Sequence, residues 1–141
     1  MDVMTAPAPA SPATRRYVLP ALADVIAIGV FVAVGRTTHD EGNAVVGFLT
    51  TAWPFLVGGG VGWLAVFAVG RGRRFVPAAP VPAGVVIWPA TVIVGMLLRT
   101  ASGQGTAAAF VIVAAVATGL LLVGWRIAAH LIATHLIGGR R

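Results

Sequence analysis

The 141-residue sequence contains no cysteine and no lysine. Without cysteine the chain can form no disulfide, no thiolate metal site and no cysteine nucleophile. Without lysine it cannot form a P-loop, whose phosphate-binding motif requires that residue. Charge is scarce as well, because charged residues make up 10% of the chain against roughly 25% in soluble domains. With 58% hydrophobic residues, the composition indicates an integral membrane protein whose expected partner is the lipid bilayer.

The net charge of +6 comes from ten arginines and four acids. The arginines lie at the ends of apolar runs rather than on one face of a helix, so we expect no nucleic-acid binding.

The long apolar runs lie at about 17–35, 45–70, 80–98 and 106–124. A helix needs roughly 20 apolar residues to cross the ~30 Å hydrocarbon core, and lipid offers no water to backbone polar groups. The sequence therefore predicts an all-α protein with a four-helix membrane domain at residues 17–125. Residues 1–16 are predicted to form a disordered cytoplasmic tail, and residues 126–141 a basic cytoplasmic or interfacial segment.

The segments that follow the first and third runs resemble each other. Arg36-Thr-Thr-His-Asp-Glu-Gly-Asn-Ala44 and Arg99-Thr-Ala-Ser-Gly-Gln-Gly-Thr-Ala107 share arginine, threonine, glycine and alanine at matching places. This internal repeat predicts two tandem helical hairpins related by a pseudo-two-fold axis along the membrane normal. A chance match between short segments rich in glycine, alanine and threonine is the alternative.

The distribution of arginine predicts the orientation. Arg36 and Arg99 lie on one side of the predicted membrane domain. The other eight arginines lie on the opposite side: Arg15, Arg16, Arg71, Arg73, Arg74, Arg126, Arg140 and Arg141. Because cytoplasmic flanks carry the excess of arginine, we expect both termini in the cytoplasm of a multi-pass protein of the cell membrane.

Past the fourth run, Arg126, His130 and Thr134 recur at every fourth residue. They would form a narrow polar stripe on an otherwise apolar helix. This helix could lie along the inner membrane interface or dock on a partner protein, and the stripe alone does not distinguish the two.

Asp24 is an ionisable residue inside the first run, which makes it a functional hypothesis by default. Helix geometry places it in the cytoplasmic half of the membrane, at a depth similar to that of Trp63, Trp88 and Thr91. One interpretation is a proton- or cation-responsive carboxylate in a small polar cavity. The other is a structural ion pair with Arg126, whose long side chain can reach inward.

Two prolines, Pro54 and Pro89, lie inside predicted helices and are expected to kink them. Such kinks are common at transport sites and also ordinary in membrane helices. At the outer side, Arg36, His39 and Arg99 are candidates for the mouth of a path. The small-residue spacing predicts helix packing at four glycines: Gly58, Gly62, Gly95 and Gly119.

No metal site is expected. His39, Asp40 and Glu41 are adjacent and cannot readily all turn onto one ion, while His130 and His135 would lie on nearly opposite faces of a helix. No Ser/His/Asp spacing suggests nucleophilic catalysis. We therefore expect neither a cofactor nor enzymatic activity.

Polar and aromatic landmarks recur in order across all four runs. They are Asp24, Phe31 to Gly35-Arg36, His39, Trp53-Pro54-Phe55, Gly58, Gly62-Trp63, Trp88, Thr91-Val92, Gly95-Met-Leu-Leu-Arg99, Gly105-Thr-Ala107, Phe110-Val-Ile-Val-Ala114 and Gly124-Trp-Arg126. This pattern, over roughly residues 20–126, resembles the domain-of-unknown-function 3054 (DUF3054) family of small bacterial and archaeal membrane proteins. The resemblance implies a fold but no activity and no functional residue.

The leading functional hypothesis is a small transport or permeation protein. Because four helices enclose little space, it is expected to act as a homo-oligomer. Asp24 would be its responsive group, Arg36 and Arg99 would flank its external mouth, and the proline kinks would shape the path. The alternative is a non-catalytic scaffold or partner subunit in which Asp24 and Arg126 clamp the first span to the fourth. A lipid-modifying enzyme is a more distant third.

Overall fold

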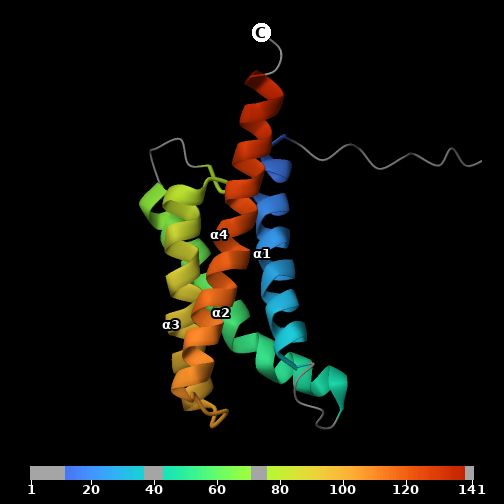
Figure 1. Cartoon of the computed structure of the whole chain (residues 1–141). Coiled ribbons are helices and arrows are strands. Elements are labelled where there is room, and N and C mark those ends of the chain that lie inside the picture. Colours follow the sequence, from blue (N-terminus) through green and yellow to red (C-terminus); the bar gives the residue numbers. More distant parts are fainter. Residues whose placement is uncertain (1–11, 37–42, 71–75, 139–141) are drawn as a thin grey trace, which may run out of the picture.

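The computed structural model describes residues 12–36, 43–70 and 76–138. These residues are helical apart from short connections, and no strand occurs among them. The helices are α1 (Pro12–Arg36), α2 (Ala44–Gly70), the short π-helical turn η1 (Pro80–Gly84), α3 (Val85–Ala101) and α4 (Ala108–Gly138) (Figure 1). Four helices, the third including η1, are long and apolar enough to cross a membrane. The prediction of an all-α, multi-pass membrane protein is confirmed.

Local sequence accounts for the helix boundaries that the structure describes. The Asn43 side chain caps α2 by accepting hydrogen bonds from the backbone N–H groups of Val45 and Val46 at 3.0 and 3.3 Å. Between α3 and α4, Gly103 and Gly105 adopt φ angles of 71° and 76°. Side chains disfavour this left-handed region, so glycine permits the tight turn.

Helices α2 and α3 pack against each other more extensively than any other pair, including α1 with α2 and α3 with α4. A Cβ atom at Gly58 would lie 2.7 Å from the carbonyl oxygen of Thr91, and one at Gly62 would lie 2.8 Å from Cα of Ile87. Glycine at both positions therefore lets the two backbones approach closely.

The other two glycines predicted to pack between helices, Gly95 and Gly119, lie against aromatic side chains. A Cβ atom at Gly95 would lie 2.8 Å from the ring of Phe55, and one at Gly119 would lie 2.9 Å from the ring of Trp88. Trp88 also donates a hydrogen bond to the carbonyl of Ala115 at 2.9 Å, which joins α3 to α4.

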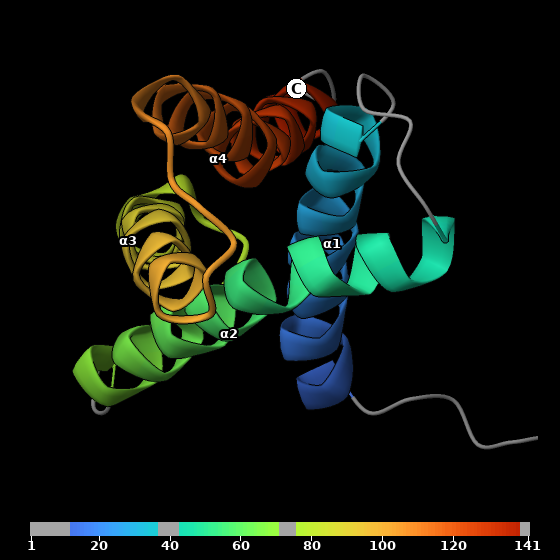
Figure 2. The ribbon, with the colours of Figure 1, turned by 90° about the horizontal axis from the view of Figure 1, so that it is seen from below.

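Helix α2 is bent, and Pro54 lies in its middle. The first part of α2 runs obliquely past α1 and the second part runs beside α3 (Figures 1 and 2). Pro89 lies inside α3.

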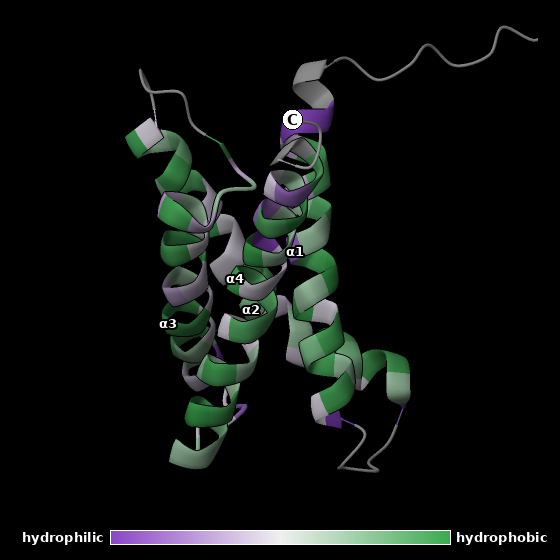
Figure 3. Ribbon diagram, turned by 45° about the horizontal axis from the view of Figure 1, so that its top comes forward, coloured by the Kyte–Doolittle hydropathy of each residue, from purple (hydrophilic) through white to green (hydrophobic). Residues whose placement is uncertain are grey.

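Hydrophobic residues cover most of the length of all four helices, and hydrophilic ones lie mainly near their ends (Figure 3). Helix α4 continues without a break past Arg126 and projects beyond the other helices (Figure 1). All side chains from Ile127 to Leu136 are exposed. No other described part of the chain therefore covers this long, largely apolar helix end.

Candidate functional site

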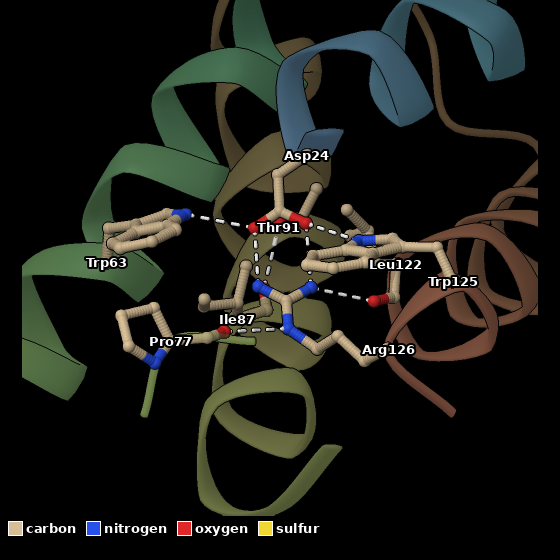
Figure 4. A network of polar contacts seen from close by, with 8 residues as sticks. All are labelled: Asp24, Trp63, Pro77, Ile87, Thr91, Leu122, Trp125 and Arg126. Carbon is tan, nitrogen blue, oxygen red and sulfur yellow. Dashed lines mark hydrogen bonds and ion pairs between the residues drawn. The ribbon is translucent and has the colours of Figure 1, made fainter. Parts of the chain in front are cut away.

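Asp24 of α1 and Arg126 of α4 form a bidentate ion pair inside the bundle (Figure 4). Arg126 Nη1 lies 2.7 Å from Asp24 Oδ1, and Nη2 lies 2.7 Å from Oδ2. Both residues are buried, with relative exposures of 3% for Asp24 and 0% for Arg126. The first and last spans are thus joined by a planar, charge-assisted pair of hydrogen bonds.

Two indole groups complete the environment of the carboxylate. Trp63 of α2 donates its Nε1–H to Asp24 Oδ2 at 3.0 Å, and Trp125 of α4 donates its own to Oδ1 at 2.9 Å. Each carboxylate oxygen therefore accepts one hydrogen bond from arginine and one from tryptophan.

The guanidinium of Arg126 also donates hydrogen bonds to two backbone carbonyl groups. Its Nε donates to the carbonyl of Pro77 at 3.1 Å, and Nη1 donates to the carbonyl of Leu122 at 2.7 Å. The guanidinium also lies over the ring of Trp125, 4.5 Å from its centroid. The network joins α1, α2, α4 and the segment that precedes η1.

A buried charge pair is tolerated only when its remaining donors and acceptors are also paired, and this network meets that condition. Any ligand or proton that bound Asp24 would have to displace a donor already in place. In this conformation the network is a closed structural contact between helices.

Two residues expected near Asp24 are bonded elsewhere. Thr91 donates to the carbonyl of Ile87 on its own helix at 2.8 Å, and Trp88 donates to Ala115. Trp125 and the carbonyls of Pro77 and Leu122 were not among the site residues predicted from the sequence. Trp125 directly precedes Arg126, so its position along α4 could have suggested it as a partner of Asp24. A backbone carbonyl, by contrast, leaves no signal in the sequence.

A cavity of about 250 Å³ lies at the other end of the bundle. All four helices line it, through Phe31, Val32, Gly35, Arg36, Thr51, Arg99 and Phe110. Its walls are mainly aromatic and aliphatic, and its two ionisable residues are arginines.

Arg99 is held in place by the turn between α3 and α4. Its Nη1 donates to Gln104 Oε1 at 2.9 Å, and Nη2 donates to the carbonyls of Gln104 and Gly105 at 3.3 and 3.4 Å. The guanidinium lies 4.4 Å from the ring centroid of Phe110. Arg99 is 9% exposed, and its Nε is the one buried side-chain nitrogen or oxygen in the described residues that lacks a hydrogen-bond partner.

Arg36 ends α1 and lies against Gly47 of α2. Its guanidinium forms no hydrogen bond or ion pair with any residue that the structure describes. The ionisable residues that line the cavity in the described part of the chain are both arginines, so it is called the positive cavity below. His39, the third residue predicted for this mouth, lies outside the described residues.

Comparison with known proteins identifies a family but no characterised relative. No curated protein and no solved structure matches the chain. The model of the family described as "Protein of unknown function (DUF3054)" matches residues 21–129, a range that contains both Asp24 and Arg126 and all residues lining the positive cavity. The chain belongs to the DUF3054 family.

Proposed function

We propose that this protein is a small transport protein of the cell membrane that takes up an anion through the arginine-lined cavity. The observation that carries the proposal is a cavity formed by all four helices, with Arg36 and Arg99 in its wall and no described acid facing them. A buried N–H without an acceptor, as at Arg99 Nε, is costly and is satisfied when a ligand supplies one.

The ligand that fits this cavity is an anion with an apolar body. Arginine binds planar or tetrahedral oxyanions through paired N–H groups. Phe31, Val32 and Phe110 offer a surface for carbon rather than for water. An aromatic sulfonate or carboxylate therefore matches the lining better than a small inorganic ion.

The orientation follows from the arginine distribution, which places both termini in the cytoplasm and the cavity at the outer face. Two tandem hairpins related along the membrane normal would produce this arrangement, and assembly as a homo-oligomer would enlarge the space between subunits. No enzymatic activity is part of the proposal.

An apolar layer separates the cavity from the Asp24–Arg126 pair. Asp24 and Arg36 are twelve residues apart on α1, about 18 Å along a helix. Between them Phe31 packs edge-on against Phe55, with ring centroids 5.1 Å apart, within the buried core. A solute that enters at the cavity would have to pass this layer and then the ion pair, which would close the inner end.

Flux into liposomes tests the proposal. Benzenesulfonate stays charged across the usual pH range and so crosses bare lipid slowly, and benzyltrimethylammonium is a cation of similar size. Purified protein in liposomes should carry the sulfonate and not the cation. Arg36→Gln should reduce uptake, and Arg36→Lys should retain part of it. His130→Gln, on the exposed end of α4, should leave uptake unchanged. Equal uptake with and without protein, or by wild type and Arg36→Gln, would refute the proposal.

A second candidate, a scaffold or partner subunit, is favoured by the exposed end of α4. Removal of residues 130–141 separates the two candidates. For a transport protein, sulfonate uptake should persist after this truncation. For a scaffold, wild type should show no uptake, and truncation should abolish a larger complex seen on native gels of solubilised membranes.

A further inference from the structure

A groove of about 430 Å³ is lined by Arg15 and Arg16 near the start of α1 and by Trp125 of α4. It therefore lies toward the end of the bundle beyond which α4 projects, an extension visible in Figure 1. The beginning of α1, the segment before η1 and α4 form its walls, through residues that include Leu19, Val76, Pro77 and Trp125. The walls are almost entirely apolar, and the two charged residues among those that line the groove are Arg15 and Arg16. The groove is separate from the positive cavity, which lies at the opposite end.

The charge at the rim of the groove has one sign. Arg15 and Arg16 are consecutive on α1, and among the described residues that line the groove there is no acidic side chain. The Arg16 guanidinium also lies over the ring of Tyr17, 5.8 Å from its centroid. An occupant with a negative head and an apolar tail would match both parts of the groove.

We infer that this groove binds an anionic phospholipid. Its headgroup phosphate would contact Arg15 and Arg16, and the first part of one acyl chain would lie along Leu19, Val76 and Trp125. Basic clusters at the membrane surface attract anionic lipids, and the apolar walls exclude a ligand that consists of the headgroup alone.

Lipid in this groove would bear directly on the buried network. Trp125 lines the groove and donates to Asp24, and Pro77 lines the groove and accepts from Arg126. A bound acyl chain would restrain both residues in the positions that the ion pair requires. The lipid would thus stabilise the closed arrangement of α1 against α4.

Thermal unfolding of the full chain in detergent tests the inference. Phosphatidylglycerol should raise Tm, whereas phosphatidylcholine with the same acyl chains and inorganic phosphate should not. Native mass spectrometry should show phosphatidylglycerol retained selectively. In the Arg15→Gln/Arg16→Gln variant its affinity should fall about thirtyfold, which corresponds to the loss of two arginine contacts at the membrane surface. His135→Gln, on the exposed end of α4 and outside the groove, should bind the lipid as wild type does.

Three results would overturn the inference. An equal rise in Tm with phosphatidylcholine would show that any lipid packs there, and an equal rise with phosphate would show a simple anion site. Undiminished phosphatidylglycerol binding by Arg15→Gln/Arg16→Gln would show that the groove is not the site. None of these results depends on whether the protein transports a solute.

Discussion

Breaking the Asp24–Arg126 pair from either side should reveal a large and unequal cost. Replacing one member of a buried ion pair leaves the other charge uncompensated, which typically costs about 3–5 kcal/mol. The two single variants are Asp24→Asn and Arg126→Gln. Asp24→Asn keeps the side-chain size, so its loss measures charge and hydrogen bonding. Arg126→Gln also shortens a fully buried side chain, so its loss includes a contribution from the space left behind.

The two losses should differ because the two residues have different ways to adapt. In Asp24→Asn, Arg126 cannot give up its proton and stays charged, with only neutral acceptors as partners: the new amide oxygen and the carbonyls of Pro77 and Leu122. In Arg126→Gln, the Asp24 carboxylate still accepts hydrogen bonds from Trp63 and Trp125. Asp24→Asn should therefore be the more destabilising change, while the double variant should lose much less than the sum of both.

The assay is thermal unfolding of the purified protein in detergent, with wild type, both single variants and the double variant measured side by side. A loss of this size corresponds to a fall in Tm on the order of 10 °C. Additive losses would mean that the two side chains do not interact, and an unchanged Tm in Asp24→Asn would mean that the carboxylate is not needed for the fold. Either result would refute the network described for Figure 4.

Substitutions at the two tryptophans of the network and at two glycines of α2 test other contacts through their effect on stability. Trp63→Phe and Trp125→Phe each remove one hydrogen bond to a charged group and keep most of the ring, so each should cost about 1.5–3 kcal/mol in chemical unfolding; a loss near zero would mean that water replaces the indole. Gly58→Ala should lower Tm strongly, because its new methyl group would lie 2.7 Å from a backbone oxygen of α3, whereas Gly60→Ala meets nothing within 4 Å and should leave Tm unchanged or slightly raised. Equal effects of the two alanine substitutions would contradict the close packing of α2 on α3.

The helices could be predicted because length and hydropathy determine them. In lipid, the backbone N–H and C=O groups of a long apolar run must form hydrogen bonds within that run, which makes it a helix. The four spans could therefore be predicted without knowing how the helices pack. Helix–helix pairing is different. Residues 36–44 and 99–107 suggest two hairpins, yet the most extensive contact is between α2 and α3, where glycines on one helix meet the backbone of the other.

The Asp24–Arg126 ion pair could be predicted from the sequence, but most of the groups that surround it could not. Asp24 and Arg126 have opposite charges and lie toward the same end of the first and last spans, so a pairing could be suggested from depth alone. The carbonyls of Pro77 and Leu122 have no signature in the sequence, because every residue carries one. The cavity likewise depends on how all four helices come together near the end of α1, and that geometry comes from packing rather than from local pattern.

The Asp24–Arg126 ion pair could act as a structural clamp between α1 and α4 or as the closure of a transport path. Replacing both residues by neutral ones distinguishes these two roles. If Asp24 and Arg126 only clamp α1 to α4, the Asp24→Asn/Arg126→Gln variant should fold, and liposomes that contain it should behave as wild-type liposomes do. If the pair closes the inner end of a transport path, the same variant should pass benzenesulfonate faster than wild type. Adding Arg36→Gln should then slow that passage again, because the sulfonate would still have to enter through the positive cavity. If one path joins the cavity to the ion pair, substitutions at both ends of the bundle should change the same benzenesulfonate flux. A purely structural ion pair predicts no such dependence.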